Sequence, residues 1–185
     1  MEVELRPVTD ADVEVFYEQQ LDPEARRVAV FPLRDHDTFT THWRERILAD
    51  EANDAWTIVA DGEVAGHMLC FERDGKREVG YWLGRPHWGQ GIATAALAAL
   101  LREVTERPLY AYVVRSNVGS IRVLEKCGFT TIPWRHRRES GSAYGSTSST
   151  IVTGPSFTIS TSMYAPKTPV STGTPSARSS SQKRS

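Results

Sequence analysis

The sequence is poor in cysteine and contains no long apolar run. Only two of its 185 residues are cysteines, Cys70 and Cys127, and no Cys-x-x-Cys spacing occurs. We therefore expect neither a disulfide framework nor a zinc site. No apolar stretch approaches the roughly 20 residues that a membrane-spanning helix needs, and residues 1–6 lack the apolar centre of a signal peptide. The sequence thus predicts a soluble, cytoplasmic protein with no membrane partner and no metal.

Large apolar residues become scarce in the last third of the chain, where the charge also changes sign. Residues 1–132 carry 15 basic and 22 acidic side chains and 11 serines and threonines, whereas residues 133–185 carry 7 basic side chains, one acidic side chain and 22 serines and threonines. Such a composition buries too little apolar surface to offset the entropy of folding. We expect one folded domain over residues 1–132 and a basic, poorly ordered tail over residues 133–185.

The tail bears on two further expectations. Its arginines cluster only at residues 135–138 and have few aromatic neighbours, so we expect no nucleic-acid partner. The change in composition near residue 133 also leads to the hypothesis that the strands which would close the domain have been replaced, as a change of reading frame would do.

Apolar periodicity predicts the elements of the domain, since strands alternate with period 2 and helices with period 3.6. The predicted strands cover residues 3–8, 56–60, 64–71, 77–83 and 109–114. The predicted helices follow Thr9, cover residues 37–48 and 92–102, and run from Ser116 to Lys126, with Gly128 as the stop signal. Asp-Gly pairs at 61–62 and 74–75 are typical of tight hairpins. They predict that the three central strands form an antiparallel meander.

A glycine-rich turn, Gly89-Gln90-Gly91, lies between the third central strand and the next helix. Glycine lets backbone N–H groups approach a ligand without a Cβ in the way, and a helix N-terminus favours an anion such as pyrophosphate. A dinucleotide-binding turn would need a third glycine where Thr94 stands, and a P-loop would need Gly-Lys-Ser/Thr, so both are excluded. A plain turn is the remaining alternative to an anion site.

Two motifs give the chain a resemblance to the GNAT superfamily of acetyltransferases. Trp88-Gly89-Gln90-Gly91-Ile92-Ala93 is similar to the acyl-CoA motif, Arg/Gln-x-x-Gly-x-Gly/Ala. The segment from Asn117 to Phe129 is similar to the Asn-x-x-Ser…Glu-Lys-x-Gly-Phe segment of the branch that acetylates ribosomal-protein N-termini. The resemblance covers roughly residues 3–132. It implies an α/β GNAT fold, a mixed, mostly antiparallel central sheet flanked by helices.

The resemblance also implies where acetyl-CoA, the cosubstrate, binds. In this family the strand before the turn splays away from the next strand, and pantetheine lies in the gap. The backbone around Trp82 and Leu83 would pair with pantetheine, and Asn117 would help to hold the cosubstrate. The residues implied to bind the pyrophosphate belong to the turn and the start of the helix, namely Trp88, Gly89, Gln90, Gly91, Ile92, Ala93 and Thr94. Because Trp88 stands where many members have Arg or Gln, backbone amides would carry more of the phosphate recognition.

Direct acetyl transfer needs a neutral amine, a polarised thioester carbonyl and a proton for the leaving thiolate. A backbone N–H near Trp82 or Leu83 is the candidate that polarises the carbonyl. Leu124 occupies the position of the tyrosine that many members use as general acid, so the resemblance points to Ser120; a helix residue bonded to its own backbone is the alternative. Glu78 is the candidate acceptor of the amine proton, through water. The alternative for Glu78 is a solvated carboxylate on a half-exposed strand.

The sequence therefore predicts an N-acetyltransferase whose acceptor is a primary amine, either a protein N-terminus or a small molecule. The competing class is an acyl-CoA-binding protein that retains the cleft without turnover, because the closing strands are missing. Three aromatic residues, Phe31, Phe39 and Trp43, either line an acceptor pocket or serve ordinary packing, and His67 is either a base or a buried sheet histidine. The oligomeric state, monomer or homodimer, stays open.

Overall fold

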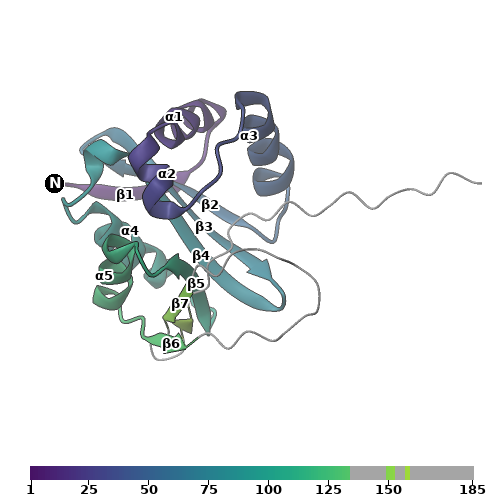
Figure 1. Ribbon diagram of the computed structural model, residues 1–185. Coiled ribbons are helices and arrows are strands. Elements are labelled where there is room, and N and C mark those ends of the chain that lie inside the picture. The colour runs from purple at the N-terminus through teal and green to yellow at the C-terminus, as the bar shows by residue number, and fades with distance from the viewer. Residues whose placement is uncertain (134–148, 153–156, 159–185) are drawn as a thin grey trace, which may run out of the picture.

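The computed structural model describes residues 1–133, 149–152 and 157–158. Figure 1 shows a central sheet with α1, α2 and α3 on one side and α4 and α5 on the other. The strands are β1 (Val3–Pro7), β2 (Asp54–Ala60), β3 (Glu63–Arg73), β4 (Lys76–Leu83), β5 (Leu109–Val114), β6 (Thr131–Pro133), β7 (Ser149–Val152) and β8 (Phe157–Thr158). The helices are α1 (Asp10–Gln20), α2 (Pro23–Ala29), α3 (His36–His42), the π-helix η1 (Trp43–Leu48), the 3-10 helix η2 (Arg85–His87), α4 (Ile92–Glu103) and α5 (Val118–Lys126).

The sheet has the strand order β1-β2-β3-β4-β5-β7-β6, with β8 also paired to β5. Neighbours from β1 to β4 are antiparallel, whereas β4 and β5 are parallel and pair only through Arg77 with Leu109 and Glu78 with Tyr110. Beyond these two pairs the strands continue without a shared ladder. This confirms the predicted mixed, mostly antiparallel sheet, and it opens the sheet between the later parts of β4 and β5.

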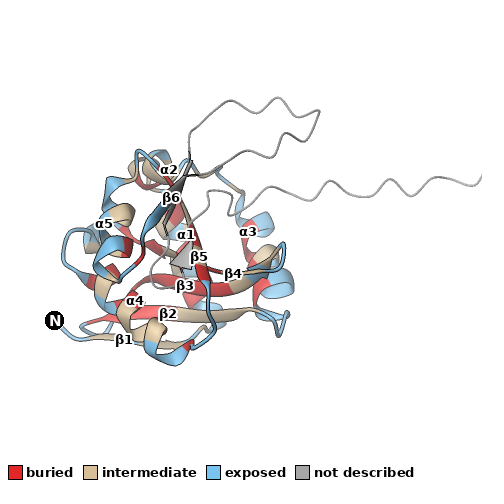
Figure 2. Cartoon of the chain, turned by 90° about the horizontal axis from the view of Figure 1, so that it is seen from below, coloured by how far each residue is buried: buried red, intermediate tan, exposed pale blue. Residues whose placement is uncertain are grey.

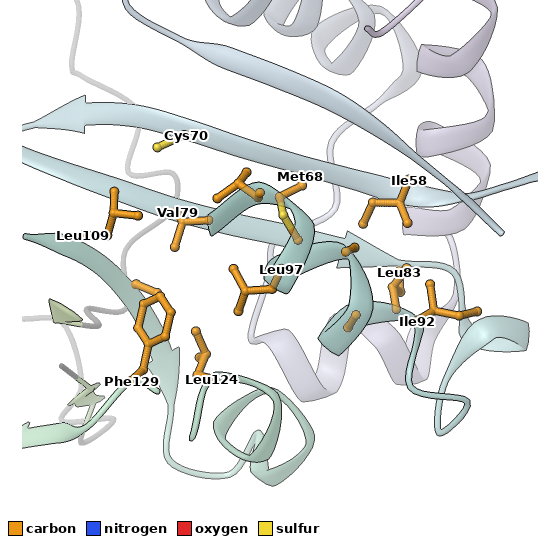
Figure 3. Close-up of a cluster of buried hydrophobic side chains, with 14 of the residues drawn as sticks. Ile58, Met68, Cys70, Val79, Leu83, Ile92, Leu97, Leu109, Leu124 and Phe129 are labelled. Carbon is orange, nitrogen blue, oxygen red and sulfur yellow. The ribbon is translucent and has the colours of Figure 1, made fainter. Parts of the chain in front are cut away.

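Each face of the sheet has its own apolar core. Buried side chains of β2 to β5 pack against α4 and α5, and Figure 3 shows Leu97 of α4 and Leu124 of α5 directed at them. On the other face, Leu69 of β3 packs under Val13 and Phe16 of α1. Figure 2 shows the buried residues concentrated along the strands, between these two layers. Helices thus cover both faces of the sheet, and each face has its own chemical environment.

The central predictions are confirmed. The meander turns at Gly62 (φ +85°) and Gly75 (φ +70°), where the backbone is left-handed, as a tight hairpin requires. Helix α5 ends at Lys126, and Gly128 has φ +87°, the left-handed conformation that closes a helix most readily with glycine.

Two N-terminal expectations need correction. Residues 23–29 form the helix α2, which is not among the helices that apolar periodicity predicts. Proline is compatible with the first helical turn, and the Asp22 side chain caps α2 by accepting from the amides of Glu24 and Ala25 at 2.8 and 2.9 Å. The helix expected over residues 37–48 begins one residue earlier and changes to the π-helix η1 at Trp43, whose N–H donates to both Phe39 and Thr40.

The tail predicted over residues 133–185 lies largely outside the described residues. Within it, β7 pairs antiparallel with β5 and β6, and β8 pairs parallel with β5. The replacement of the closing strands stays a prediction.

Candidate active site

The gap between β4 and β5 is lined by the backbone groups of alternate residues of β4, those that face away from β3. The Gly84 N–H donates to the carbonyl of Ala65 at 2.9 Å, and hydrogen-bonded pairs alternate along an antiparallel ladder. The backbone groups of Trp82 therefore turn toward β3. Those of Tyr81 and Leu83 turn away from β3, toward the gap.

This register changes the expected pantetheine contacts. Trp82 pairs with His67, and a Cβ added at Gly66 would overlap the carbonyl oxygen of Trp82, so this carbonyl is directed into the sheet. The Leu83 carbonyl does face the gap, but it accepts from the indole Nε1 of Trp88 at 2.9 Å. The backbone left for a ligand is the N–H of Leu83 and the N–H and C=O of Tyr81. The backbone groups of Trp82 thus point away from the expected pantetheine contact. Leu83 keeps only its N–H for that contact.

The glycine turn leads directly into α4. Gly91 is the N-cap with φ +84°, and no side chain caps the helix. The Ala95 N–H donates to the Gly91 carbonyl at 3.0 Å, so the amides of residues 92–94 lack a place in the helical ladder. The side chains of Ile92 and Ala93 are buried. This stretch therefore offers a ligand backbone N–H groups and the positive end of a helix dipole, which suit a pyrophosphate.

Two side chains of the predicted cosubstrate site stabilise the turn by donating hydrogen bonds to nearby backbone carbonyls. Trp88 ties it to the end of β4 through the indole bond described above. The Gln90 side-chain amide donates to the Pro86 carbonyl at 2.7 Å. Both side chains donate a hydrogen bond within the loop, which leaves most of the anion site to the main chain.

The N-terminus of α5 lies under the same gap. The Asn117 Oδ1 accepts from the Ser120 N–H at 3.0 Å and caps the helix. The buried Tyr81 hydroxyl lies near the Ser120 side chain, in a geometry that does not form a well-aligned hydrogen bond. Burial raises the pKa of Tyr81 above its ordinary value, so the phenol stays protonated at neutral pH. Sequence reasoning missed Tyr81, although its alternation with Glu78 along β4 would have assigned it to the α5 side.

Glu78 lies at the point where the pairing of β4 with β5 ends. Its partner in β3, Phe71, packs in the core under α1 and α3, so the carboxyl group is on that face. The side chain is only 2% exposed, which makes the solvated alternative wrong. Burial raises the pKa of Glu78 to about 7, against the opposing effect of Arg73, whose Nη1 is 3.7 Å from Oε2. Burial, and then the charge of Glu78, raise the pKa of Tyr112 to about 12.

The other candidate residues on this face either pack in the core or line a pocket. His67 lies between the rings of Phe16 and Trp43, with centroid distances of 4.7 and 4.8 Å, and burial lowers its pKa to about 3. Trp43 and Phe39 are core residues with 2% and 1% exposure. Phe31 lines a pocket, and its ring centroid is 5.8 Å from that of Trp82.

Two properties of the described residues, 1–133 with the short strands β7 and β8, are negative. They contain no group of three or more His, Cys, Asp or Glu side chains arranged to hold a metal ion. Within the same residues, every helix is too short or too polar to cross a membrane.

A parallel strand pair that opens beside an uncapped, glycine-bearing helix N-terminus is the arrangement that the resemblance to the GNAT acetyltransferases implies for an acyl-CoA site. The comparisons with known proteins agree and give the acyl group. The acetyltransferase (GNAT) domain model matches residues 2–130, and the chain belongs to this family of N-acetyltransferases, which use acetyl-CoA.

The individual relatives share modest sequence identity with this chain. The uncharacterized N-acetyltransferase p20 of Bacillus licheniformis is 27% identical over 141 residues, which are 68% of this chain and 77% of the relative. The probable N-acetyltransferase YjcK of Bacillus subtilis (strain 168) is 33% identical over 98 residues, 48% of this chain and 54% of the relative.

Solved structures share the fold at low identity. RimL, a ribosomal L7/L12 alpha-N-protein acetyltransferase in complex with coenzyme A, is 20% identical with a TM-score of 0.66, and the match covers 84% of this chain and 94% of RimL. The microcin C7 self-immunity acetyltransferase MccE, in complex with acetyl-CoA and AMP, is 18% identical with a TM-score of 0.65 over 82% of this chain and 91% of MccE.

Proposed function

We propose that this protein transfers an acetyl group from acetyl-CoA directly to a primary amine in the gap between β4 and β5. The observation that carries the proposal is the position of Glu78. A buried carboxyl group with a pKa near 7 lies where the two strands part, on the face opposite the helices α4 and α5. General bases work best when their pKa is close to the ambient pH.

The described residues supply a binding surface for the cosubstrate. The amides of residues 92–94 suit the pyrophosphate, and the gap-facing backbone of Tyr81 and Leu83 suits the amide groups of pantetheine. Asn117 uses Oδ1 to cap α5, so its remaining role in binding is that of its side-chain N–H groups. When bound, acetyl-CoA supplies an activated acetyl thioester.

The reaction forms a C–N bond and breaks a C–S bond, so one proton must leave the nitrogen and one must reach the sulfur. Glu78 accepts the first, directly or through a water. The N–H of Tyr81 or Leu83 is aimed at the gap and can stabilise the negative charge that develops on the thioester oxygen. The hydroxyl of Ser120, with the protonated hydroxyl of Tyr81 near it, is the donor group on the α5 side.

A paired measurement tests the proposal. Acetyl-CoA binding is measured by titration calorimetry, and thiol release is followed with a panel of amines that includes peptides with free N-termini and small primary amines. We expect binding, and thiol release that depends on the amine. Binding without release on any amine would favour the acyl-CoA-binding alternative, and the absence of binding would contradict both functions.

A further inference from the structure

We propose that the amine acceptor carries a carboxylate and that this carboxylate binds Arg26 in the pocket formed by α2 and the segment after it. The inference rests on the proposed acetyl transfer and names the class of acceptor. The pocket has a volume of about 480 Å³. Its lining consists of Pro23, Arg26, Arg27, Val30, Phe31 and Pro32.

The charges of the pocket favour an anion, because both of its charged side chains are arginines. Arg27 is engaged in a bidentate pair with Glu24, at 2.7 and 2.8 Å. In the described part of the chain no acidic partner is found for Arg26, and its Nε is buried without a hydrogen-bond acceptor. A buried donor on a cation is costly to leave unmatched. The guanidinium fork fits a carboxylate in two parallel hydrogen bonds.

Phe31 connects this pocket to the proposed reaction site. Its ring packs against Trp82 with centroids 5.8 Å apart, and Trp82 projects from the same face of β4 as Glu78, four residues further along the strand. The Trp82 indole Nε1 is buried and also lacks an acceptor in the described part of the chain. Four residues of a strand span about 13 Å, so an acceptor with its amine in the gap must be at least this long to extend past Trp82 and Phe31 to Arg26.

The surroundings of Phe31 add positive charge. The guanidinium carbon of Arg34 lies 5.8 Å from the centre of the Phe31 ring. Burial, and then the charges of Arg34 and Arg46, lower the pKa of His42 to about 4. Like charges at an interface repel a wrong partner. A cationic group of the acceptor placed beside Arg26 and Arg34 is therefore disfavoured, although the helices α1 to α3 as a whole carry more acidic than basic side chains.

Matched acceptors test the inference. Thiol release is measured with 12-aminododecanoate against dodecylamine, which are long enough for this path, and with amidated tetrapeptides that differ only by Asp, Asn or Lys at the last position after a free N-terminal alanine. We expect kcat/KM about tenfold higher for the carboxylate-bearing member of the better series, the size of one charged hydrogen-bond pair at a partly exposed site, and lowest for Lys. The series with the larger ratio identifies a small molecule or a peptide as the source of the carboxylate.

Variants then assign the preference to Arg26. Arg26→Gln should lower the Asp-to-Asn ratio to about 1, and Arg26→Lys should restore part of it, since lysine keeps the charge without the fork. Arg102→Gln, at an exposed position on α4, should keep the wild-type ratio. Equal rates for acidic and neutral acceptors in the wild type would overturn the inference and leave the acetyl transfer standing. A preference that survives Arg26→Gln would also overturn it. No release from any amine would end both proposals.

Discussion

The two faces of the sheet carry different candidate sites, one for the cosubstrate and one for the acceptor. One site consists of main chain and the other of side chains. On the α4 and α5 face, the candidate cosubstrate site consists almost entirely of main chain: the amides of residues 92–94 and the gap-facing backbone of β4. On the α1 to α3 face, the candidate acceptor site consists of side chains, above all Glu78, Phe31 and Arg26. Side chains can be replaced while a fold is kept, whereas a backbone site needs the fold itself.

This difference has an electrostatic counterpart. The cosubstrate face offers fixed dipoles whose strength does not change with pH. The acceptor face contains titratable groups whose pKa values burial has moved, upward to about 7 for Glu78 and downward to about 3 for His67. Acetyl-CoA binding should therefore depend weakly on pH near neutrality, and turnover should depend on it strongly.

The largest effect should come from Gly91→Asp. The new side chain must adopt φ +84° and adds a negative charge at the uncapped start of α4. We expect no calorimetric binding of acetyl-CoA even at millimolar concentration. Gly62→Asp is the matched control, since Gly62 has φ +85° and equally open surroundings in the β2–β3 turn. It should cost similar stability and leave binding intact; normal binding by Gly91→Asp would show that the site is misplaced.

Glu78→Gln should have the next largest effect and should act on turnover alone. Loss of a general base commonly lowers kcat by about a hundredfold, while the dissociation constant of acetyl-CoA should stay unchanged. Because the carboxylate is the active form and its pKa is about 7, wild-type kcat/KM should rise with pH through that region, and the variant should lose this rise. Glu72→Gln, at an exposed neighbouring position of β3, is the control. An unchanged pH profile in Glu78→Gln would remove the base assignment.

The same substitution should increase stability. The pKa of Glu78 is raised from 4.5 to about 7 in the folded protein, so the folded state binds more protons than the unfolded state between these values. The free energy of unfolding therefore falls as pH rises from about 4.5 to about 7, by about 3 kcal/mol from this group. Chemical denaturation at pH 8 should show Glu78→Gln more stable than the wild type, with the difference vanishing near pH 4.

The sequence predicted the elements that carry the candidate cosubstrate site, because turns and helix ends leave marks in local sequence. Gly89 and Gly91 are required by positive φ values of 74° and 84°, and Asn117 is required as a cap. Apolar periodicity also fixed β3, β4, α4 and β5 to within about two residues. The family match over residues 2–130 agrees with the resemblance that these motifs carried.

The acceptor face was less predictable because burial is a property of tertiary structure. The Asp74-Gly75 hairpin pairs Phe71 with Glu78, but nothing in the sequence indicates that helices cover this face or that Tyr112 comes beside the carboxyl group, so a solvated carboxylate was the favoured interpretation. The spacing of Phe39 and Trp43 fitted both core and pocket, and only the packing with His67 decides for core. Helix α2 did leave a signal, an Asp-Pro-Glu start, which the prolines obscured.

The smallest effect should come from Trp88→Phe, which tests whether a side chain contributes to the backbone site by holding it in place. The substitution keeps most of the apolar ring and removes only the indole N–H that donates to the Leu83 carbonyl. A hydrogen bond of this kind contributes about 1 kcal/mol, so if the bond preorganises the turn, the affinity for acetyl-CoA should fall about fivefold. The maximal rate with saturating acetyl-CoA should change little, because Glu78 is untouched. Trp56→Phe, on β2 and away from the turn, should leave the affinity unchanged. Equal affinities of Trp88→Phe and the wild type would mean that the turn is held by its backbone alone.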